Sequence, residues 1–265
     1  MIKNKLAIIG CGNIGLSLLQ GFLAEGGVGP GDITVTRRNT GELEPLGSSG
    51  ITITSDNVNA IGKEGIIIIA VKPYNFFGVL DELKDHIDPD NHTLISVTAG
   101  VTIGQIEEKT GNKIKIFRAM PNISASVGKS VSCISYNEAG RIAAGTVTEL
   151  FDLIGATMAI EEDLMESATI LGACGVAFVL RFIRAMIQGG IQIGFDAATA
   201  SVIVNHTVKG AAELLIERHQ HPEFEIDKVT TPKGCTIVGL NEMEHNGFSS
   251  SLIRGIVASF EKIEK

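Results

Sequence analysis

The chain has 265 residues, of which 44% are hydrophobic and 31 are glycine, so it can bury a core large enough for one large or two modest domains. Its formal net charge is −8, and no long basic stripe is present to neutralise phosphates. This charge pattern argues against nucleic acid or an acidic membrane surface as a partner.

The first predicted element is a strand over the apolar run 6–9, which leads directly into Gly10-Cys11-Gly12-Asn13-Ile14-Gly15 and then into a helical pattern. In this context Gly10 permits a tight turn, Gly12 lets the backbone approach a pyrophosphate, and Gly15 lets the helix pack closely on the strand. The amides at the helix start would bind the anion. A glycine-rich turn can simply connect two elements without binding a ligand, but the position of this one between a strand and a helix favours dinucleotide binding.

The second predicted strand, 33–36, ends at Arg37 and Arg38 and carries no carboxylate there. An acidic side chain at this point would bind a ribose hydroxyl, whereas a basic one suits a 2′-phosphate. The two guanidinium groups therefore favour NADP over NAD. The alternative is a solvated basic turn without a ligand.

Strand-like and helical patterns alternate up to about residue 160, which predicts an α/β Rossmann domain with a doubly wound, mostly parallel sheet over residues 1–160. Beyond it we expect an all-helical domain over residues 161–265, with Asp196 as a helix N-cap and Asn246-Gly247 as a helix stop. The expected strands are 6–9, 33–36, 66–71, 94–97, 114–117, 130–135 and 158–160, and the expected C-terminal helices are 163–172, 176–188, 197–218, 236–246 and 249–262.

Three segments carry residues that the fold alone does not require. Lys72 follows a predicted strand, at the sheet edge where open α/β sheets bind ligands, and either meets a phosphate or a substrate carboxylate or is simply solvated. Asn122 ends the strand–turn segment 117–122, which by itself is only a loop. Residues 229–237 connect two helices, and there the amides that open the second helix could hold a small carboxylate, or Thr236 could merely cap it.

Other features indicate no further site. The four cysteines lack metal or disulfide spacing, which fits a reducing cytoplasm, and no signal peptide is evident before the first strand. We expect no metal at His219 and His221, since no third ligand is apparent. The acidic run 161–163 is expected to compensate a helix dipole, and the uncharged stretch 167–180, too short to span a membrane, to be a buried helix.

Taken together, these motifs resemble the 1-pyrroline-5-carboxylate reductases, NADPH-linked enzymes that make proline. The resemblance runs from Leu6 to the final helix, and its specific part is the turn in the helical region. The segments that carry it are Gly10-Cys11-Gly12-Asn13-Ile14-Gly15, Ala70-Val71-Lys72-Pro73, Ala99-Gly100-Val101-Thr102-Ile103, Arg118-Ala119-Met120-Pro121-Asn122, Glu161-Glu162-Asp163 and Thr231-Pro232-Lys233-Gly234-Cys235-Thr236.

This resemblance implies a Rossmann domain followed by a helical dimerisation domain, and reduction of a cyclic imine carboxylate by NADPH. The residues expected to hold the cofactor are Gly10, Gly12, Asn13, Ile14, Gly15, Arg37, Arg38, Asn57, Ala70, Val71, Lys72, Pro73 and Asn122. Those expected to hold the substrate are Lys72, Thr231, Gly234, Cys235 and Thr236, with the Thr236 hydroxyl hydrogen-bonded to the imine nitrogen as the catalytic group.

Two departures from the family pattern lie beside the expected substrate. Val176 follows Gly175 where the family has proline, so we expect a softer helix break. Lys233 replaces a glycine, which strains the turn if that position needs a positive φ but adds positive charge beside a carboxylate. The alternatives are therefore a reductase of another cyclic imine or of a 3-hydroxy acid, and a dinucleotide-binding sensor without turnover.

The helical region also predicts assembly. Its apolar, glycine-rich faces over 170–182 and 188–195 exceed what one small domain covers, so we expect a homodimer or a larger homo-oligomer. The resemblance adds that the 231–236 turn of one subunit completes the pocket of the other.

Overall fold

The computed structural model describes residues 5–24, 26–63 and 65–263. These form two compact units: the first extends to Cys174 and also includes the described residues from Lys262 onward, and the second comprises Gly175–Glu261. The sequence places the domain boundary at residue 160, where the alternation of strand and helix patterns ends. That boundary stays a prediction.

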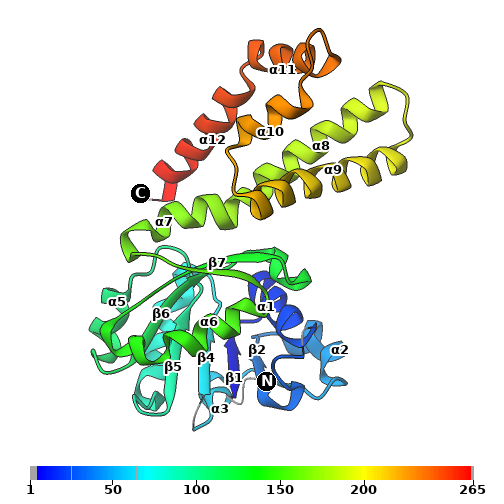
Figure 1. Cartoon of the computed structure of the whole chain (residues 1–265). Coiled ribbons are helices and arrows are strands. Elements are labelled where there is room, and N and C mark those ends of the chain that lie inside the picture. The colour runs from blue at the N-terminus through cyan, green and yellow to red at the C-terminus, as the bar shows by residue number, and fades with distance from the viewer. Residues whose placement is uncertain (1–4, 25, 64, 264–265) are drawn as a thin grey trace. The chain divides into compact units, whose positions relative to one another are not determined.

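The first unit is built on an eight-stranded sheet with the order β3-β2-β1-β4-β5-β6-β7-β8 (Figure 1). All neighbouring strands are parallel except β6 and β7, which pair antiparallel. The strands are β1 (Leu6–Ile9), β2 (Ile33–Thr36), β3 (Thr52–Thr54), β4 (Gly65–Ile69), β5 (His92–Ser96), β6 (Lys115–Met120), β7 (Ser130–Tyr136) and β8 (Gly155–Ala159). The prediction of a doubly wound, mostly parallel sheet is confirmed.

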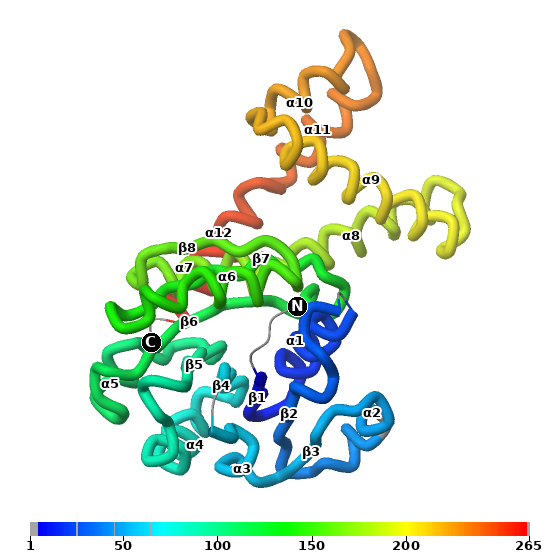
Figure 2. Tube along the Cα trace, turned by 60° about the horizontal axis from the view of Figure 1, so that its bottom comes forward, coloured from blue at the N-terminus to red at the C-terminus, as the bar shows by residue number. Residues whose placement is uncertain are grey.

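Helices cover both faces of this sheet (Figure 2). Along β4, Ile66 and Ile68 join a core that includes helices α1 and α6, whereas Ile67 and Ile69 join a second core on the opposite face, which includes α3, α4 and α5. Burial on both faces explains why the central strands read as continuous apolar runs. The helices are α1 (Asn13–Ala24), α2 (Glu44–Gly47), α3 (Asn57–Ile61), α4 (Pro73–Leu83), α5 (Ile103–Thr110), α6 (Ala144–Asp152) and α7 (Met165–Ala168).

The second unit is helical throughout, as predicted. Asp196 caps α9 by accepting hydrogen bonds from the amides of Ala198 and Thr199, and Gly247 follows α11 with φ +77°. Both predicted helix boundaries are therefore confirmed. The helices are α8 (Gly175–Gln192), α9 (Ala197–Arg218), α10 (Pro222–Val229), α11 (Cys235–His245) and α12 (Phe248–Ile263).

The sequence pattern does not predict strand β3 or helix α10. Strand β3 is short and lies at the sheet edge, and its threonines give no apolar run. Helix α10 opens at Pro222, with the His221 side chain accepting from the amide of Glu223, but its eight residues are too few for a clear helical period.

The helix predicted over 163–172 does not end in a break. It continues through the π-helical segment Thr169–Cys174 into α8. A π-helical segment has wider turns than an α-helix, so the helix is distorted here but not interrupted.

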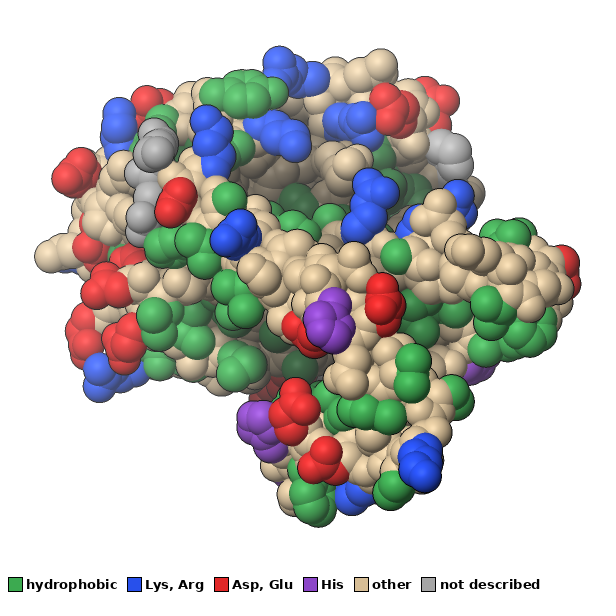
Figure 3. Space-filling view, turned by 90° about the horizontal axis from the view of Figure 1, so that it is seen from above, with side chains coloured by type: hydrophobic (Ala, Val, Ile, Leu, Met, Phe, Trp, Pro, Cys, Tyr) green, Lys and Arg blue, Asp and Glu red, His purple; other side chains and the backbone are tan. Residues whose placement is uncertain are grey.

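The expectation that residues 167–180 form a buried helix is wrong for the single chain, because Leu171 is 65% exposed and Leu180 is 54% exposed. Hydrophobic side chains lie among the surface atoms in Figure 3. By length and composition alone, the helical stretch Glu162–Gln192 could cross a membrane, although a helix covered by another chain meets the same criteria.

Candidate functional site

A cavity of about 1040 Å³ opens beside the end of β1 and the start of α1. A Cβ atom on Gly10 would clash with Val71 Cγ1, and one on Gly15 would lie 2.9 Å from the Gly10 carbonyl oxygen. A Cβ on Gly12 would meet nothing within 4 Å. The first and third glycines therefore allow tight packing, whereas the second leaves the backbone open to the cavity, as a pyrophosphate requires.

A chain of hydrogen bonds holds the glycine turn in place. The Gly10 amide donates to Thr36 Oγ1 at 3.1 Å, and that hydroxyl donates to Asn57 Oδ1 at 2.7 Å. Asn57 Nδ2 in turn donates to Glu82 Oε2 at 2.9 Å. Asn57 lines the cavity, and its side-chain amide is engaged on both sides, so it fixes the turn. Its contact with the cofactor stays a prediction.

The two arginines after β2 lie in different environments. Arg37 is half-buried, with Nη1 donating to the Cys11 carbonyl oxygen at 3.3 Å and Nη2 paired with Glu42 at 2.7 Å. Arg38 is exposed and has no ion-pair partner in the described part of the chain. Both line the cavity, where a 2′-phosphate would meet two guanidinium groups.

The Cys11 thiol of the glycine turn is buried, which keeps it neutral to a higher pH than an exposed thiol. Loss of solvent raises its pKa from 9.0 to about 11, against a smaller lowering by the Arg37 charge. A neutral thiol places no negative charge beside an incoming phosphate.

The loop after β4 forms another wall of the cavity through Ala70, Val71 and Lys72, whereas the predicted cofactor residue Pro73 does not line it. The Thr98 hydroxyl donates to the Val71 carbonyl oxygen at 3.0 Å, which ties this loop to the end of β5. Lys72 is exposed, lines the cavity and precedes α4, at the edge of the sheet predicted from the sequence. Tyr74, which sequence reasoning did not single out, also lines the cavity and is 83% exposed.

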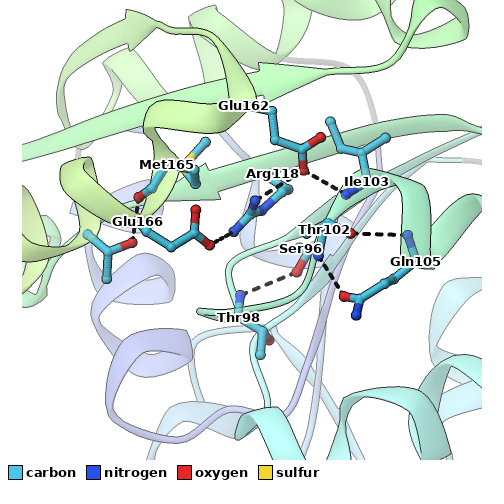
Figure 4. Close-up of polar contacts among 10 residues, drawn as sticks. Ser96, Thr98, Thr102, Ile103, Gln105, Arg118, Glu162, Met165 and Glu166 are labelled. Atoms are coloured by element: carbon cyan, nitrogen blue, oxygen red, sulfur yellow. Dashed lines mark hydrogen bonds and ion pairs between the residues drawn. The ribbon is translucent and has the colours of Figure 1, made fainter. Parts of the chain in front are cut away.

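A buried arginine, Arg118, lies on β6, where it is paired in register with Ser96 at the end of β5 (Figure 4). Arg118 is 1% exposed; its Nη1 lies 3.0 Å from Glu162 Oε1 and its Nη2 lies 2.9 Å from Glu166 Oε1. The same Glu162 oxygen accepts from the Ile103 amide at 2.7 Å, in the first turn of α5. The sequence pattern does not reveal this cluster, because the acidic run 161–163 by itself predicts only charge compensation at its own helix start.

Asn122 lies just beyond Arg118 and is buried. Its side-chain amide donates to the Gly172 carbonyl oxygen at 3.0 Å, and its Oδ1 accepts from the Ser124 amide at 2.9 Å. It therefore supports the π-helical segment, and Ile123 rather than Asn122 lines the cavity. A direct contact between Asn122 and the cofactor stays a prediction.

The segment 231–236 forms a tight turn at the start of α11. The Gly234 amide donates to the Thr231 carbonyl oxygen at 2.9 Å, and Gly234 is the N-cap of the helix. Thr236 therefore lies inside the first helical turn and is not the cap. The amides of Cys235 and Thr236 have no preceding helical carbonyl to bond, so they are available to an anion.

Lys233 occupies the third position of this turn with φ +58°. That position, after a proline, is the one where a type II turn demands a positive φ and favours glycine. The sequence predicts backbone strain at Lys233 if this position needs a positive φ, and the structure meets that condition. Its side chain is exposed, so its charge lies at the surface of the turn.

Neither histidine of the 219–221 segment belongs to a metal cluster: His219 ends α9 with φ +52°, and His221 caps α10. Among the described residues, no group of three or more potential ligands could hold a metal ion.

A glycine cradle with an arginine pair at the edge of a parallel sheet, followed by a helical unit, is the arrangement of a dinucleotide-dependent oxidoreductase. Family models agree with this class. Residues 5–100 match "NADP oxidoreductase coenzyme F420-dependent", and residues 162–265 match "Pyrroline-5-carboxylate reductase dimerisation".

Individual relatives extend the match to the whole chain. Pyrroline-5-carboxylate reductase 2 of Dictyostelium discoideum is 41% identical over 100% of this chain and 94% of its own length. Pyrroline-5-carboxylate reductase 1 of the same organism is 39% identical over 99% of this chain, which spans only 50% of that longer protein. A Plasmodium falciparum pyrroline carboxylate reductase structure with NADP bound superposes with a TM-score of 0.89, at 27% identity over 99% of this chain and 98% of that one. The chain belongs to the pyrroline-5-carboxylate reductase family.

The Arg118 cluster predicts an unequal response to removal of its two charges. Glu162→Ala should lower the free energy of unfolding by about 3 kcal/mol, because it leaves a buried guanidinium with one carboxylate fewer and the Ile103 amide without its acceptor. Arg118→Met should cost only about 1 kcal/mol, since methionine fills the space and both carboxylates reach water. Urea unfolding measures both changes.

The exposed pair Arg141–Glu138 provides the control, since its side chains are 73% and 84% exposed. Arg141→Met should change stability by less than about 0.5 kcal/mol. If Arg118→Met proves as costly as Glu162→Ala, the buried charge is not what makes this cluster sensitive.

The positive φ at Lys233 predicts that glycine is the better residue there for stability. Lys233→Gly should raise the free energy of unfolding by about 1 kcal/mol, measured by urea unfolding, because glycine adopts this conformation without steric cost. Lys233→Ala keeps a Cβ and should bring no such gain. Equal stabilisation by both variants would show that the lysine charge, and not the backbone, carries the cost.

Proposed function

We propose that this chain reduces 1-pyrroline-5-carboxylate to L-proline with NADPH. The observation that carries the proposal is the 231–236 turn, which opens α11 with free amides in a domain that the dimerisation family model matches. A whole-length relative that is 41% identical is named for this activity.

The residues of the first unit fit NADPH. The open approach to Gly12 accommodates the pyrophosphate at the start of α1, and Arg37 and Arg38 provide the charge for a 2′-phosphate. Val71 and Lys72 border the same cavity through the loop that Thr98 anchors. When bound, NADPH supplies the hydride that the imine carbon accepts.

The 231–236 turn fits the substrate. The Cys235 and Thr236 amides can hold the carboxylate, with the Lys233 charge close by, and the Thr236 hydroxyl can hydrogen-bond the ring nitrogen. A protonated imine is already electrophilic, so the protein needs to align the reacting atoms and orient the nitrogen and does not need a strong acid.

A second copy of the chain completes the site in this proposal. The dimerisation model covers residues 162–265, and many apolar side chains there are exposed in the single chain, among them Ile193 at 79% and Val238 at 66%. Surfaces of this kind are covered in oligomers, and a homodimer with an isologous interface is the simplest solution. The 231–236 turn of one subunit then faces the cofactor cavity of the other.

We also propose the cytoplasm as the compartment. All four cysteines are free thiols in the structure, as a reducing compartment requires. Cell fractionation with an antibody to the chain tests this directly, and recovery in a secreted or membrane fraction would overturn it.

Substrate choice is the direct test of the function. NADPH oxidation, followed as a loss of absorbance, should be fast with 1-pyrroline-5-carboxylate and much slower with 1-piperideine-2-carboxylate. Reduction of NADP⁺ by any 3-hydroxy acid, followed as a gain of the same absorbance, should also be much slower. A faster rate with the larger ring would assign a different cyclic imine, and no turnover with any of them would leave a dinucleotide-binding protein without this activity.

The proposed role of the Thr236 hydroxyl predicts that two substitutions of similar size have different effects on kcat. Thr236→Val should lower kcat by about 100-fold, within the usual range for a positioned proton-handling group, whereas Thr236→Ser should keep most of the activity. Steady-state NADPH oxidation measures both. Equal losses in the two variants would mean that the hydroxyl has no chemical role.

A composite site predicts complementation between two inactive variants. Gly12→Asp repels the pyrophosphate, and Thr236→Val removes the hydroxyl, so each homodimer should be inactive. Unfolded and refolded together, they should regain about a quarter of the wild-type activity, because half of the dimers are mixed and each has one intact site. If mixed dimers form and no activity returns, the site lies within one chain.

A further inference from the structure

The Arg37 guanidinium is held between two acceptors in the structure. Its Nη1 donates to the Cys11 carbonyl oxygen of the glycine turn at 3.3 Å, and its Nη2 lies 2.7 Å from Glu42 Oε2. Both terminal nitrogens of the side chain that should meet a 2′-phosphate are therefore already engaged, one of them by a carboxylate.

The position of Glu42 follows from the turn after β2. Asn39 caps the 3₁₀ helix Thr40–Leu43, its Oδ1 accepting from the Gly41 amide at 3.2 Å, and Leu43 anchors the other end in the core at 1% exposure. The backbone of Glu42 is thus fixed between a cap and a buried leucine. This local structure places the Glu42 backbone beside Arg37, and the Glu42 side chain, 63% exposed, reaches the guanidinium from there.

We propose that Glu42 limits the preference of this enzyme for NADP(H) over NAD(H) by occupying the Arg37 guanidinium. This inference rests on the proposed function, in which Arg37 and Arg38 receive the 2′-phosphate. A phosphate that binds Arg37 must displace the carboxylate or share the guanidinium with it, and the two groups carry the same sign of charge.

NAD carries a ribose hydroxyl in place of this phosphate, so it meets no such repulsion. Arg38 has no ion-pair partner among the described residues and remains free to meet the phosphate in either case. Glu42 therefore weakens the binding of NADP and leaves the binding of NAD nearly unchanged.

Glu44 provides a matched control two residues away. It is exposed, begins α2 and pairs with no cation in the described chain. Glu44→Gln removes the same charge from nearly the same place without freeing Arg37.

Calorimetric titration of the full-length chain with NADP⁺ and with NAD⁺ at low salt tests the proposal. Glu42→Gln should lower the Kd for NADP⁺ by about three- to tenfold and change the Kd for NAD⁺ by less than about twofold, whereas Glu44→Gln should change both by less than about twofold. The gain should shrink in 0.5 M KCl, because salt screens an exposed pair.

The same gain should be largely lost when Glu42→Gln is made in an Arg37→Ala background. If it persists in full there, Glu42 acts only by general repulsion and the proposed competition for Arg37 is wrong. An unchanged or higher Kd for NADP⁺ in Glu42→Gln would also overturn it. Failure of the proposed cofactor assignment is seen separately, as the absence of NADP⁺ binding to the unaltered chain.

Discussion

The close approach of two backbone segments at Gly10 is the constraint on which the cofactor side of this protein depends. With φ +87° and no space for a Cβ against Val71, only glycine lets β1 turn into α1 while the loop after β4 packs beside it. The Thr36 hydroxyl then fixes the turn by accepting from the Gly10 amide. Once these contacts are set, the free amides of α1, the arginines after β2 and the 70–73 loop all border one cavity.

Much of the fold was predictable because the central strands are buried on both faces. The bounds of β1 and β2 agree with the predicted runs to the residue, and the cap at Asp196 places the start of α9. The pattern fails where burial is partial or the element is short, as in β3 and α10. It also fails for the helix around Leu171, because apolar residues predict burial but do not say whether the covering surface belongs to the same chain.

The site was predictable where a short motif fixes local geometry. The glycine turn and the 231–236 turn are such motifs. The positive φ of Lys233 was expected only conditionally, from the glycine that the resembling family has there, because a proline at the preceding position suits type I and type II turns alike. Contacts between distant segments cannot be predicted from a local sequence pattern. Arg118 and Glu162, for example, are 44 residues apart, and the fold of the sheet brings them together. The pairing of Arg37 with Glu42 is nearer in sequence, but it depends on a 3₁₀ turn that the composition does not reveal.

The proposed function requires the cavity at Gly12 and the turn before α11 to form one reductase site. This can be tested by a crystal structure of the protein with NADP⁺ and L-proline. We expect the pyrophosphate against the Gly12 backbone, the 2′-phosphate at Arg37 and Arg38, and the proline carboxylate on the Cys235 and Thr236 amides of the second subunit. A dinucleotide bound elsewhere, or proline held away from that turn, would contradict it.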